Sequence, residues 1–233
     1  MRQIVKNKMR IEGLSVVIPA LNAAAGLPAT LAALGGAPDE ILVVDGGSTD
    51  GTAQAAAGAR VITAPRGRGT QLAAGIAAAQ NPWLLLLHAD TILAPGWAEA
   101  VARAMAEPGF AYHFRFALDD HSAPARRLER AVAWRCRALG LPYGDQGLLI
   151  HRSLLDEVGG LRPLPLMEDV DLVRRLGRRR LRALPVAAVT SAARWRRDGW
   201  LARSARNLTC LGLFTLGVPP RIIARIYAGR RGG

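Results

Sequence analysis

The stretch ILVVDGGSTDGT (residues 41–52) decides the fold, because a run of aliphatic residues stops there at an aspartate. An aliphatic run without a polar face is typical of a strand buried on both sides of a parallel sheet. Ligands of open α/β sheets bind beyond the carboxyl ends of the strands. We therefore interpret Asp45 as lying at the rim of a binding crevice, where Gly47 lets a ligand approach the backbone closely.

The same pattern of strand followed by helix recurs on both sides of this stretch. Apolar strands are expected over residues 14–21, 40–45, 59–65 and 82–90, and helices over residues 28–34, 49–57 and 69–80. Alternation at this spacing predicts an α/β fold with a doubly wound, mostly parallel sheet and helices on both faces. Thr49 or Asp50 is the expected cap of the second helix.

From Phe110 onward the pattern is less regular. Here we expect a strand of a mixed sheet over residues 110–120, an amphipathic helix over 123–141, a turn, strand and short helix over 144–160, a loop and helix over 164–179, a last strand over 181–191, and a helical tail from Trp200 that breaks at Pro219. No low-complexity linker separates the two parts of the chain. The sequence therefore predicts a single domain over residues 1–233 in which both halves share one sheet.

Charge is distributed unevenly along the chain. The formal net charge is +13, and from residue 121 onward 22 Lys and Arg residues face 8 Asp and Glu residues. Such a surface suits phosphate-bearing ligands, nucleic acid or an anionic membrane, and it equally suits a solvated arginine-rich surface. Binding to nucleic acid is not expected, because the few aromatic residues are not interleaved with the basic ones.

Cysteine content and hydropathy indicate a cytoplasmic location. Cys136 and Cys210 form neither a disulfide framework nor a metal-binding pair, and both are expected in the core. The basic residues 1–10 lead into no adequate signal-peptide core, because Pro19 and Asn22 interrupt the candidate. The apolar stretches are shorter than the ~20 residues that a membrane-spanning helix needs.

Three short segments carry candidate chemistry. In LHADT (residues 87–91), Asp90 could hold a divalent cation together with substrate phosphates, although an aspartate there is also typical of a helix N-cap before Pro95. In PLMEDVDL (residues 165–172), Glu168 and Asp169 could supply a general base, although acidic residues also favour helix starts for electrostatic reasons. The segment PRGRGTQLAAG contributes a phosphate-binding loop, whose candidate ligand contacts are Arg66, Arg68 and Gln71.

The order of these motifs is more specific than any one of them. SVVIPALN, ILVVDGGSTDGT, PRGRGTQLAAG, LLLLHADT, GDQGLLIHRSLLDEVGG and MEDVDLVRRL follow one another over residues 14–176. The chain resembles the family 2 glycosyltransferases of the GT-A fold, and in particular small standalone bacterial members named arsenosugar-biosynthesis glycosyltransferases. The resemblance implies a nucleotide-binding half (residues 14–109), an acceptor-side half (110–198) and a helical tail (199–233).

The resemblance also implies roles for single residues. The nucleoside pocket would be lined by Asp45 and by the segment Pro19, Ala20, Leu21 and Asn22. The segment His88, Ala89 and Asp90 stands where the family has its DxD motif, so Asp90 would bind the metal. Asp169 would be the catalytic base with Glu168 beside it. Asp145 and Gln146 would lie near the sugar and acceptor, and Arg194 and Trp195 would contact the diphosphate and acceptor.

Three positions depart from the family pattern. Gly46 replaces the second aspartate of DDGS, His88 replaces the first aspartate of DxD, and Ser191 replaces the first residue of QxxRW. The expected activity is inverting, Mg²⁺- or Mn²⁺-dependent transfer of a sugar from a nucleotide-diphosphate sugar to an acceptor that is either a small molecule or lipid-linked. The alternatives are a nucleotidyltransferase and a non-catalytic nucleotide- or nucleic-acid-binding module. The basic tail also suggests peripheral contact with a membrane.

Overall fold

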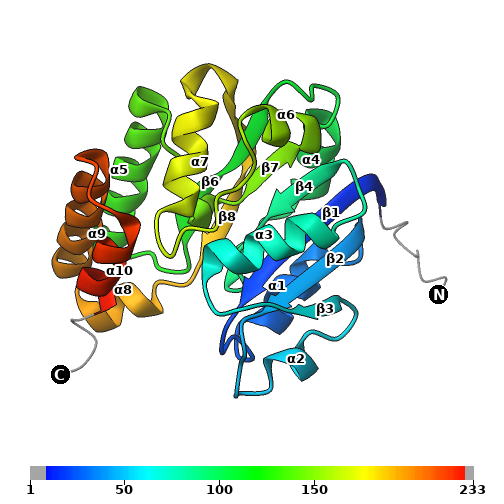
Figure 1. Cartoon of the computed structure of the whole chain (residues 1–233), viewed down its shortest axis with the longest axis horizontal. Helices are drawn as coiled ribbons and strands as arrows, with labels where there is room; N and C mark the ends of the chain where they lie inside the picture. The colour runs from blue at the N-terminus through cyan, green and yellow to red at the C-terminus, as the bar shows by residue number, and fades with distance from the viewer. Residues whose placement is uncertain (1–8, 229–233) are drawn as a thin grey trace.

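The computed structural model describes residues 9–228, in which eight strands form one sheet with helices on both faces (Figure 1). The strands are β1 (Ile11–Ala20), β2 (Pro38–Asp45), β3 (Arg60–Thr63), β4 (Trp83–Leu86), β5 (Thr91–Leu93), β6 (Ala111–Leu118), β7 (Leu148–His151) and β8 (Leu181–Thr190). The helices are α1 (Leu27–Leu34), α2 (Thr52–Ala55), α3 (Arg68–Ala78), α4 (Trp97–Ala104), α5 (Ala123–Leu139), α6 (Arg152–Glu157), α7 (Glu168–Leu176), α8 (Ala193–Asp198), α9 (Trp200–Thr215) and α10 (Pro220–Ala228). Short 3₁₀ turns occupy Gly144–Gln146 and Arg178–Arg180.

The order of strands confirms the doubly wound α/β fold. The sheet runs β3-β2-β1-β4-β7-β6-β8-β5, and the first four strands in this order are parallel to one another. Their carboxyl ends therefore lie along one edge. Strand β7 is antiparallel to both β4 and β6 and joins the two halves of the chain in one sheet, as expected.

Alternate residues of β1 pack on opposite faces of the sheet, as the period of a strand requires. Val16 and Ile18 belong to the core that contains α1 and α4, whereas Val17 belongs to the core that contains α3, α6 and α7. Helix α3 lies very close to the sheet at Gly75, where a Cβ atom would stand 2.3 Å from Val17 Cγ1. The glycine thus permits the close approach that places the start of α3 over the carboxyl edge.

Three local expectations are wrong. Helix α2 starts at Thr52 and its N-cap is Gly51, which adopts a φ of 81°, while Asp50 just before it accepts a hydrogen bond from Thr52 N–H at 3.1 Å. The fourth strand ends at Leu86, four residues before Asp90, and the short strand β5 follows. Helix α4 starts at Trp97 after Gly96, so Asp90 is not a helix cap.

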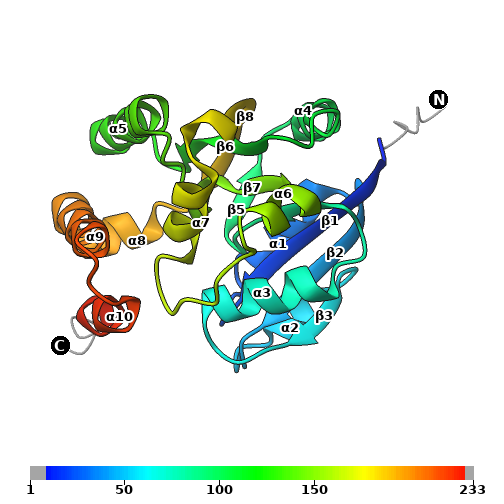
Figure 2. The ribbon, with the colours of Figure 1, turned by 45° about the horizontal axis from the view of Figure 1, so that its top comes forward.

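The C-terminal helices form a separate layer at the β6 side of the sheet. Figure 2 shows α5, α9 and α10 set well apart from the end of the sheet that holds β1 to β3. Cys210 of α9 is buried and Cys136 of α5 is partly buried, in agreement with the core positions expected for them. Within residues 9–228, no helix combines the length and apolarity needed to cross a bilayer.

Candidate active site

The loops after β1 and β2 are tied together at the carboxyl edge of the sheet. Asp45, the last residue of β2, accepts hydrogen bonds from the Ser48 hydroxyl (2.5 Å) and backbone N–H (3.2 Å). The Ser48 hydroxyl in turn accepts from the backbone N–H of Asn22 (2.9 Å), whose side chain accepts from Thr49 N–H (2.9 Å). Asn22 adopts a φ of 49°, which asparagine tolerates better than most residues. The sequence-predicted residues Asn22 and Asp45 therefore belong to one fixed loop pair.

Gln71 of α3 links the ends of β1 and β2 at the carboxyl edge of the sheet. Its side-chain amide is buried and donates to the carbonyl oxygens of Ala20 and Val44, both at 2.7 Å. A Cβ atom on Gly46 would lie 3.0 Å from this amide, which its two hydrogen bonds hold in place. This contact explains why glycine occupies the position of the second aspartate of DDGS. Gln71 thus supports the strand ends, whereas Gly47 beside them is exposed.

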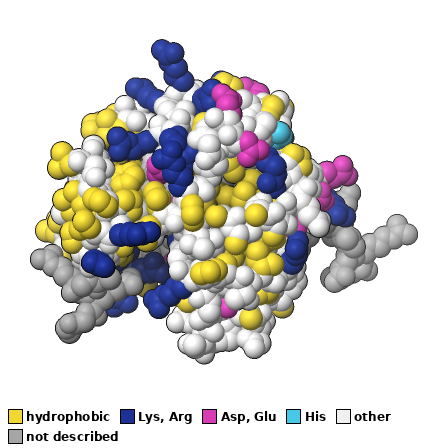
Figure 3. All heavy atoms as spheres, in the orientation of Figure 1, with side chains coloured by type: hydrophobic (Ala, Val, Ile, Leu, Met, Phe, Trp, Pro, Cys, Tyr) yellow, Lys and Arg dark blue, Asp and Glu magenta, His cyan; other side chains and the backbone are white. Residues whose placement is uncertain are grey.

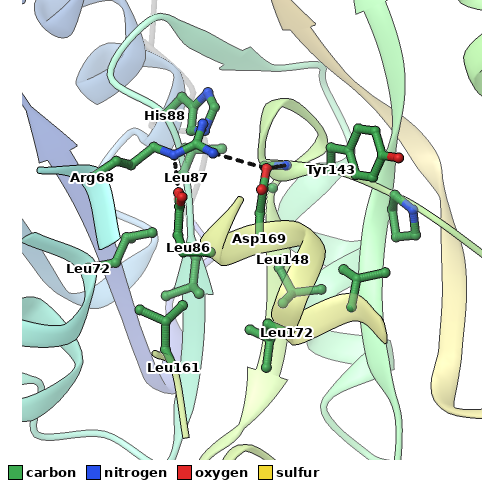
Figure 4. Close-up of a pocket in the computed structure, with 15 residues that line it drawn as sticks. Arg68, Leu72, Leu86, Leu87, His88, Tyr143, Leu148, Leu161, Asp169 and Leu172 are labelled. Atoms are coloured by element: carbon green, nitrogen blue, oxygen red, sulfur yellow. Dashed lines mark hydrogen bonds and ion pairs between the residues drawn. The ribbon is translucent and has the colours of Figure 1, made fainter. Parts of the chain in front are cut away.

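An Arg68 cluster, consisting of Arg68, Glu168, Asp169 and His88, lies between the two halves of the chain (Figure 4). The Arg68 guanidinium forms an ion pair with the buried Glu168 and a second one with Asp169 (Nη2 to Oδ2, 3.1 Å). Its Nη1 lies 3.1 Å from Nε2 of His88. Arg68 is the first residue of α3 and the two carboxylates begin α7, so the cluster joins two helix starts.

Asp169 is the most strongly organised carboxylate of the cluster. Its Oδ2 also accepts from the backbone N–H of Gly144, and its Oδ1 accepts from that of Val170, both at 2.8 Å. Burial acts to raise the pKa of this carboxyl, but Arg68 and the two N–H groups outweigh burial and hold the pKa below its ordinary value. Asp169 is therefore ionised at neutral pH, and its side chain retains 19% exposure.

The other titratable groups of the cluster shift differently. Burial raises the pKa of Glu168 even though Arg68 opposes this effect. Burial and the neighbouring Arg68 lower the pKa of His88 to about 4, so this imidazole is neutral at pH 7. Glu168 and Asp169, adjacent in sequence, therefore differ in acidity: the charge of Asp169 further raises the pKa of Glu168, whereas Arg68 and two backbone N–H groups lower the pKa of Asp169.

The 3₁₀ turn Gly144–Gln146 places Asp145 near Arg68 and Asp169. Burial raises the pKa of Asp145 to about 6, and its Oδ1 is buried without a hydrogen-bond partner among the described residues. The hydroxyl of Tyr143 is likewise buried without a hydrogen-bond partner among the described residues. The Arg135 guanidinium stacks over the Tyr143 ring, 3.8 Å from its centroid. The side chain of the adjacent Gln146 is instead bound within the protein. Its Oε1 accepts from Tyr143 N–H (3.3 Å) in the turn, and its Nε2 donates to the Phe114 carbonyl of β6 (3.0 Å).

Asp90 lies in the loop between β4 and β5 with its side chain 36% exposed. Its nearest cation is Arg194 of α8, whose Nη2 lies 3.7 Å from Oδ2. The neighbouring Ala89 carbonyl accepts from the Thr30 hydroxyl of α1 at 2.9 Å. Trp195, the residue after Arg194, stacks on Trp200 at 5.8 Å in a small apolar cluster, and its contact with substrate stays a prediction.

Beneath the Arg68 cluster is a small apolar cavity of about 30 Å³. Figure 4 shows Leu72, Leu86 and Leu172 below the polar groups. The cavity is far smaller than the roughly 300 Å³ or more of a typical ligand pocket. A sugar nucleotide would therefore have to bind outside this cavity. Arg66, in the loop before α3, is exposed.

Arg135, Tyr143 and Gly144 are site residues that the sequence did not indicate. Arg135 looks like any of the arginines on its amphipathic helix, and Gly144 acts through its backbone. A Cβ atom on Gly144 would lie 2.8 Å from His88 Nε2 and 3.0 Å from Asp169 Oδ2. The glycine in GDQG is thus the signal that could have located this close approach.

Known proteins resemble this chain in sequence and in fold. Uncharacterized glycosyltransferases of Mycobacterium tuberculosis and Mycobacterium bovis are 45% identical to it over 82 residues, which are 34% of this chain and 37% of theirs. Glucosyl-3-phosphoglycerate synthase from Mycobacterium tuberculosis, solved with Mn²⁺ and UDP-glucose, superposes with a TM-score of 0.60 at 23% identity, over 88% of this chain and 79% of that one. TarS residues 1–349 from S. aureus superpose with a TM-score of 0.60 at 16% identity, over 77% and 60% of the two chains.

The likeness to solved structures confirms the GT-A fold. The sequence match to the uncharacterized glycosyltransferases spans little more than a third of their length. The finer resemblance to arsenosugar-biosynthesis members stays a prediction. The family itself follows from a longer match, because the profile of Glycosyl transferase family 2 covers residues 15–164, which is more than half of the chain. The chain belongs to glycosyl transferase family 2.

Proposed function

We propose that this protein transfers a sugar from a nucleotide-diphosphate sugar to an acceptor hydroxyl with inversion. The observation that carries the proposal is Asp169, an ionised and partly exposed carboxylate at the carboxyl edge of the sheet. Membership of family 2 supports the same activity. Free Cys136 and Cys210 fit a reducing compartment, so we place the activity in the cytoplasm.

In the proposed mechanism Asp169 is the general base. The carboxylate offers about four acceptor positions and uses three, for Gly144, Val170 and Arg68, so one remains for an acceptor hydroxyl. As the acceptor proton passes to Asp169, the acceptor oxygen bonds to the anomeric carbon. The bond from that carbon to the diphosphate breaks, and the departing oxygen takes the electron pair. A single displacement inverts the anomeric centre.

Stabilisation of the departing diphosphate is proposed for Arg194 and Arg66. Among the described residues, Arg194 forms one ion pair, the 3.7 Å contact with Asp90, and its side chain is 59% exposed, which leaves N–H donors for phosphate oxygens. Electrostatic stabilisation of developing charge is usually the largest catalytic contribution. Arg68 is less suited to this role, because the two carboxylates already engage it.

The proposed cofactor is Mg²⁺ or Mn²⁺, held by Asp90 together with the donor diphosphate. Among the described residues, no group of three or more His, Cys, Asp or Glu side chains could hold a metal ion by itself. Asp90 nevertheless supplies one accessible carboxylate, and His88 beside it is engaged by Arg68. This donor set fits a cation that shares its ligands with substrate phosphates, where it would neutralise charge on the leaving group.

Replacing Asp169 tests the assignment of the base. We expect Asp169→Asn to bind a nucleotide sugar normally and to turn over roughly 10²- to 10⁴-fold more slowly, because the base acts only in the transition state. Asp171→Asn is the matched control, since Asp171 on another face of α7 pairs with Arg162 (3.2 Å) and Arg175 (2.8 Å). The control should keep most activity.

The measurement is nucleoside diphosphate release from a panel of nucleotide sugars, with calorimetric donor binding alongside. Equal turnover by Asp169→Asn and the wild type would remove Asp169 from the mechanism. Release of pyrophosphate in place of nucleoside diphosphate would identify a nucleotidyltransferase. Binding without any turnover across the panel would favour a nucleotide-binding module.

Metal binding should depend on the nucleotide. In thermal-shift measurements, Mn²⁺ alone should stabilise the wild type little, whereas Mn²⁺ with UDP should stabilise it more than UDP alone. Asp90→Asn should lose this Mn²⁺ dependence. Asp156→Asn, an exposed carboxylate on α6, is the control and should behave as the wild type. A Mn²⁺ dependence that survives in Asp90→Asn would disprove the assignment.

Asp145 is proposed to accept a hydrogen bond from a hydroxyl of the sugar or acceptor, since its Oδ1 lacks a partner among the described residues. The pKa of Asp145 is about 6 in the folded protein and near 3.9 in the unfolded chain. Without ligand, ionised Asp145 should therefore lower the free energy of unfolding above about pH 6, and this effect should vanish below about pH 4. Asp145→Asn should therefore raise the free energy of unfolding by about 3 kcal/mol at pH 8 and hardly at all near pH 4. Chemical denaturation at both pH values measures this, and an equal effect at both would contradict it.

A further inference from the structure

Helix α9 exposes large apolar side chains along its whole length. Leu201 is 87% exposed, Leu208 66% and Leu216, at the end of the helix, 83%. With about 100° of rotation per residue, the exposed positions of this helix fall within an arc of about 140°. That arc contains only Leu201, Ala202, Ala205, Leu208, Thr209, Gly212, Thr215 and Leu216, none of which is charged.

The arginines of α9 point the other way. Arg203 is buried and Arg206 nearly so, and both donate to Asp198, at 2.7 and 2.8 Å. Arg203 also stacks over the ring of Trp195 at 5.2 Å. A surface helix in water normally buries its leucines and exposes its charges. In α9 this pattern is inverted, and internal ion pairs hold it so.

Helix α10 continues the same exposed surface. Ile222 and Ile226 are each 47% exposed, while Ile223 is fully buried and anchors the helix. Arg221 and Arg225 are also exposed, on the adjoining part of the helix circumference. Figure 3 shows apolar side chains gathered over α9 and α10, with basic side chains beside them. We call the surface made by Leu201, Leu208, Leu216, Ile222, Ile226, Arg221 and Arg225 the tail face.

Charge decides which partner fits the tail face. From Gly199 to Gly233 the sequence has six arginines and no Asp or Glu. Arg203 and Arg206 are paired with Asp198, so among the described residues Arg221 and Arg225 carry the exposed charge of the tail face. A second copy in a two-fold dimer would bring arginines against arginines, because such an interface pairs a patch with itself. Nucleic acid would match the arginines but leave the leucines in water. An anionic bilayer satisfies both, since it offers apolar depth beneath a negative surface.

We propose that the tail face docks this protein on anionic membranes, with the leucines and isoleucines of α9 and α10 inserted at the headgroup boundary. The site lies close to this surface along the chain. Helix α8 carries Arg194 near Asp90 at its start and leads through Gly199 directly into α9. Docking would therefore hold the open edge of the sheet near the membrane. The proposal does not depend on the activity proposed above.

Flotation of the full-length protein with lipid vesicles tests the proposal. Wild type should float with vesicles containing phosphatidylglycerol and remain in the soluble fraction with pure phosphatidylcholine, and raising the salt should weaken the binding. The triple variant L201Q/L208Q/L216Q should bind anionic vesicles at least tenfold more weakly. These leucines are exposed, so the variant should unfold at nearly the wild-type temperature.

Two further variants complete the experiment. Val61→Gln removes an exposed aliphatic side chain on β3, at the other end of the sheet, and should bind as the wild type. R221Q/R225Q should lose the preference for anionic vesicles even if the triple variant proves unstable. Absence of wild-type binding at both low and moderate salt would overturn the proposal. So would a wild-type dimer in sedimentation that the triple variant converts to monomer, because a second copy would then cover the tail face.

Discussion

The contact of Arg68 with Glu168 and Asp169 is the interaction on which the site depends. Two adjacent carboxylates cannot be held together in a mostly buried place without a cation between them. Arg68 supplies that cation from the start of α3, and Gly69 after it allows the approach, since a Cβ atom there would lie 2.5 Å from the Leu164 carbonyl oxygen. The same ion pairs tie the first half of the chain to the second. They also keep Asp169 ionised, as its proposed role requires.

The site carries a cost in stability that fits a binding function. Glu168 Oε2, Asp145 Oδ1 and the Tyr143 hydroxyl are buried without a partner among the described residues. Buried polar groups without hydrogen bonds are costly and rare in folded proteins. Met167, which precedes the two carboxylates, adopts a φ of 67° that is unusual for its type. Unsatisfied groups and a strained backbone thus collect where substrate contacts are proposed, as is common at functional sites.

The sequence predicted the features that are local. The apolar runs located β1, β2 and β4, and the abrupt polar residues Asn22 and Asp45 located the edge of the sheet. Long-range arrangements could not be predicted in the same way. The three residues of β5 are too few to form a recognisable pattern, and the antiparallel direction of β7 is set by its neighbours. Gln71 looks like an ordinary helix residue in the sequence, and only the folded chain brings the two strand ends to its amide. Only the motif resemblance suggested a substrate contact for Trp195, and its stacking on Trp200 could not be predicted from the sequence.

Titration of Asp169 by carbon-13 NMR of the aspartate carboxyls tests the central claim that Arg68 keeps this carboxylate ionised. The comparison is between wild type and R68Q/E168Q, which removes the cation together with its buried partner and so leaves no isolated buried charge at Glu168. The spectrum of Asp169→Asn identifies the resonance. The account predicts a pKa of Asp169 below its ordinary value in the wild type and a higher pKa in the double variant. An unchanged pKa in the double variant, or a raised one in the wild type, would contradict it.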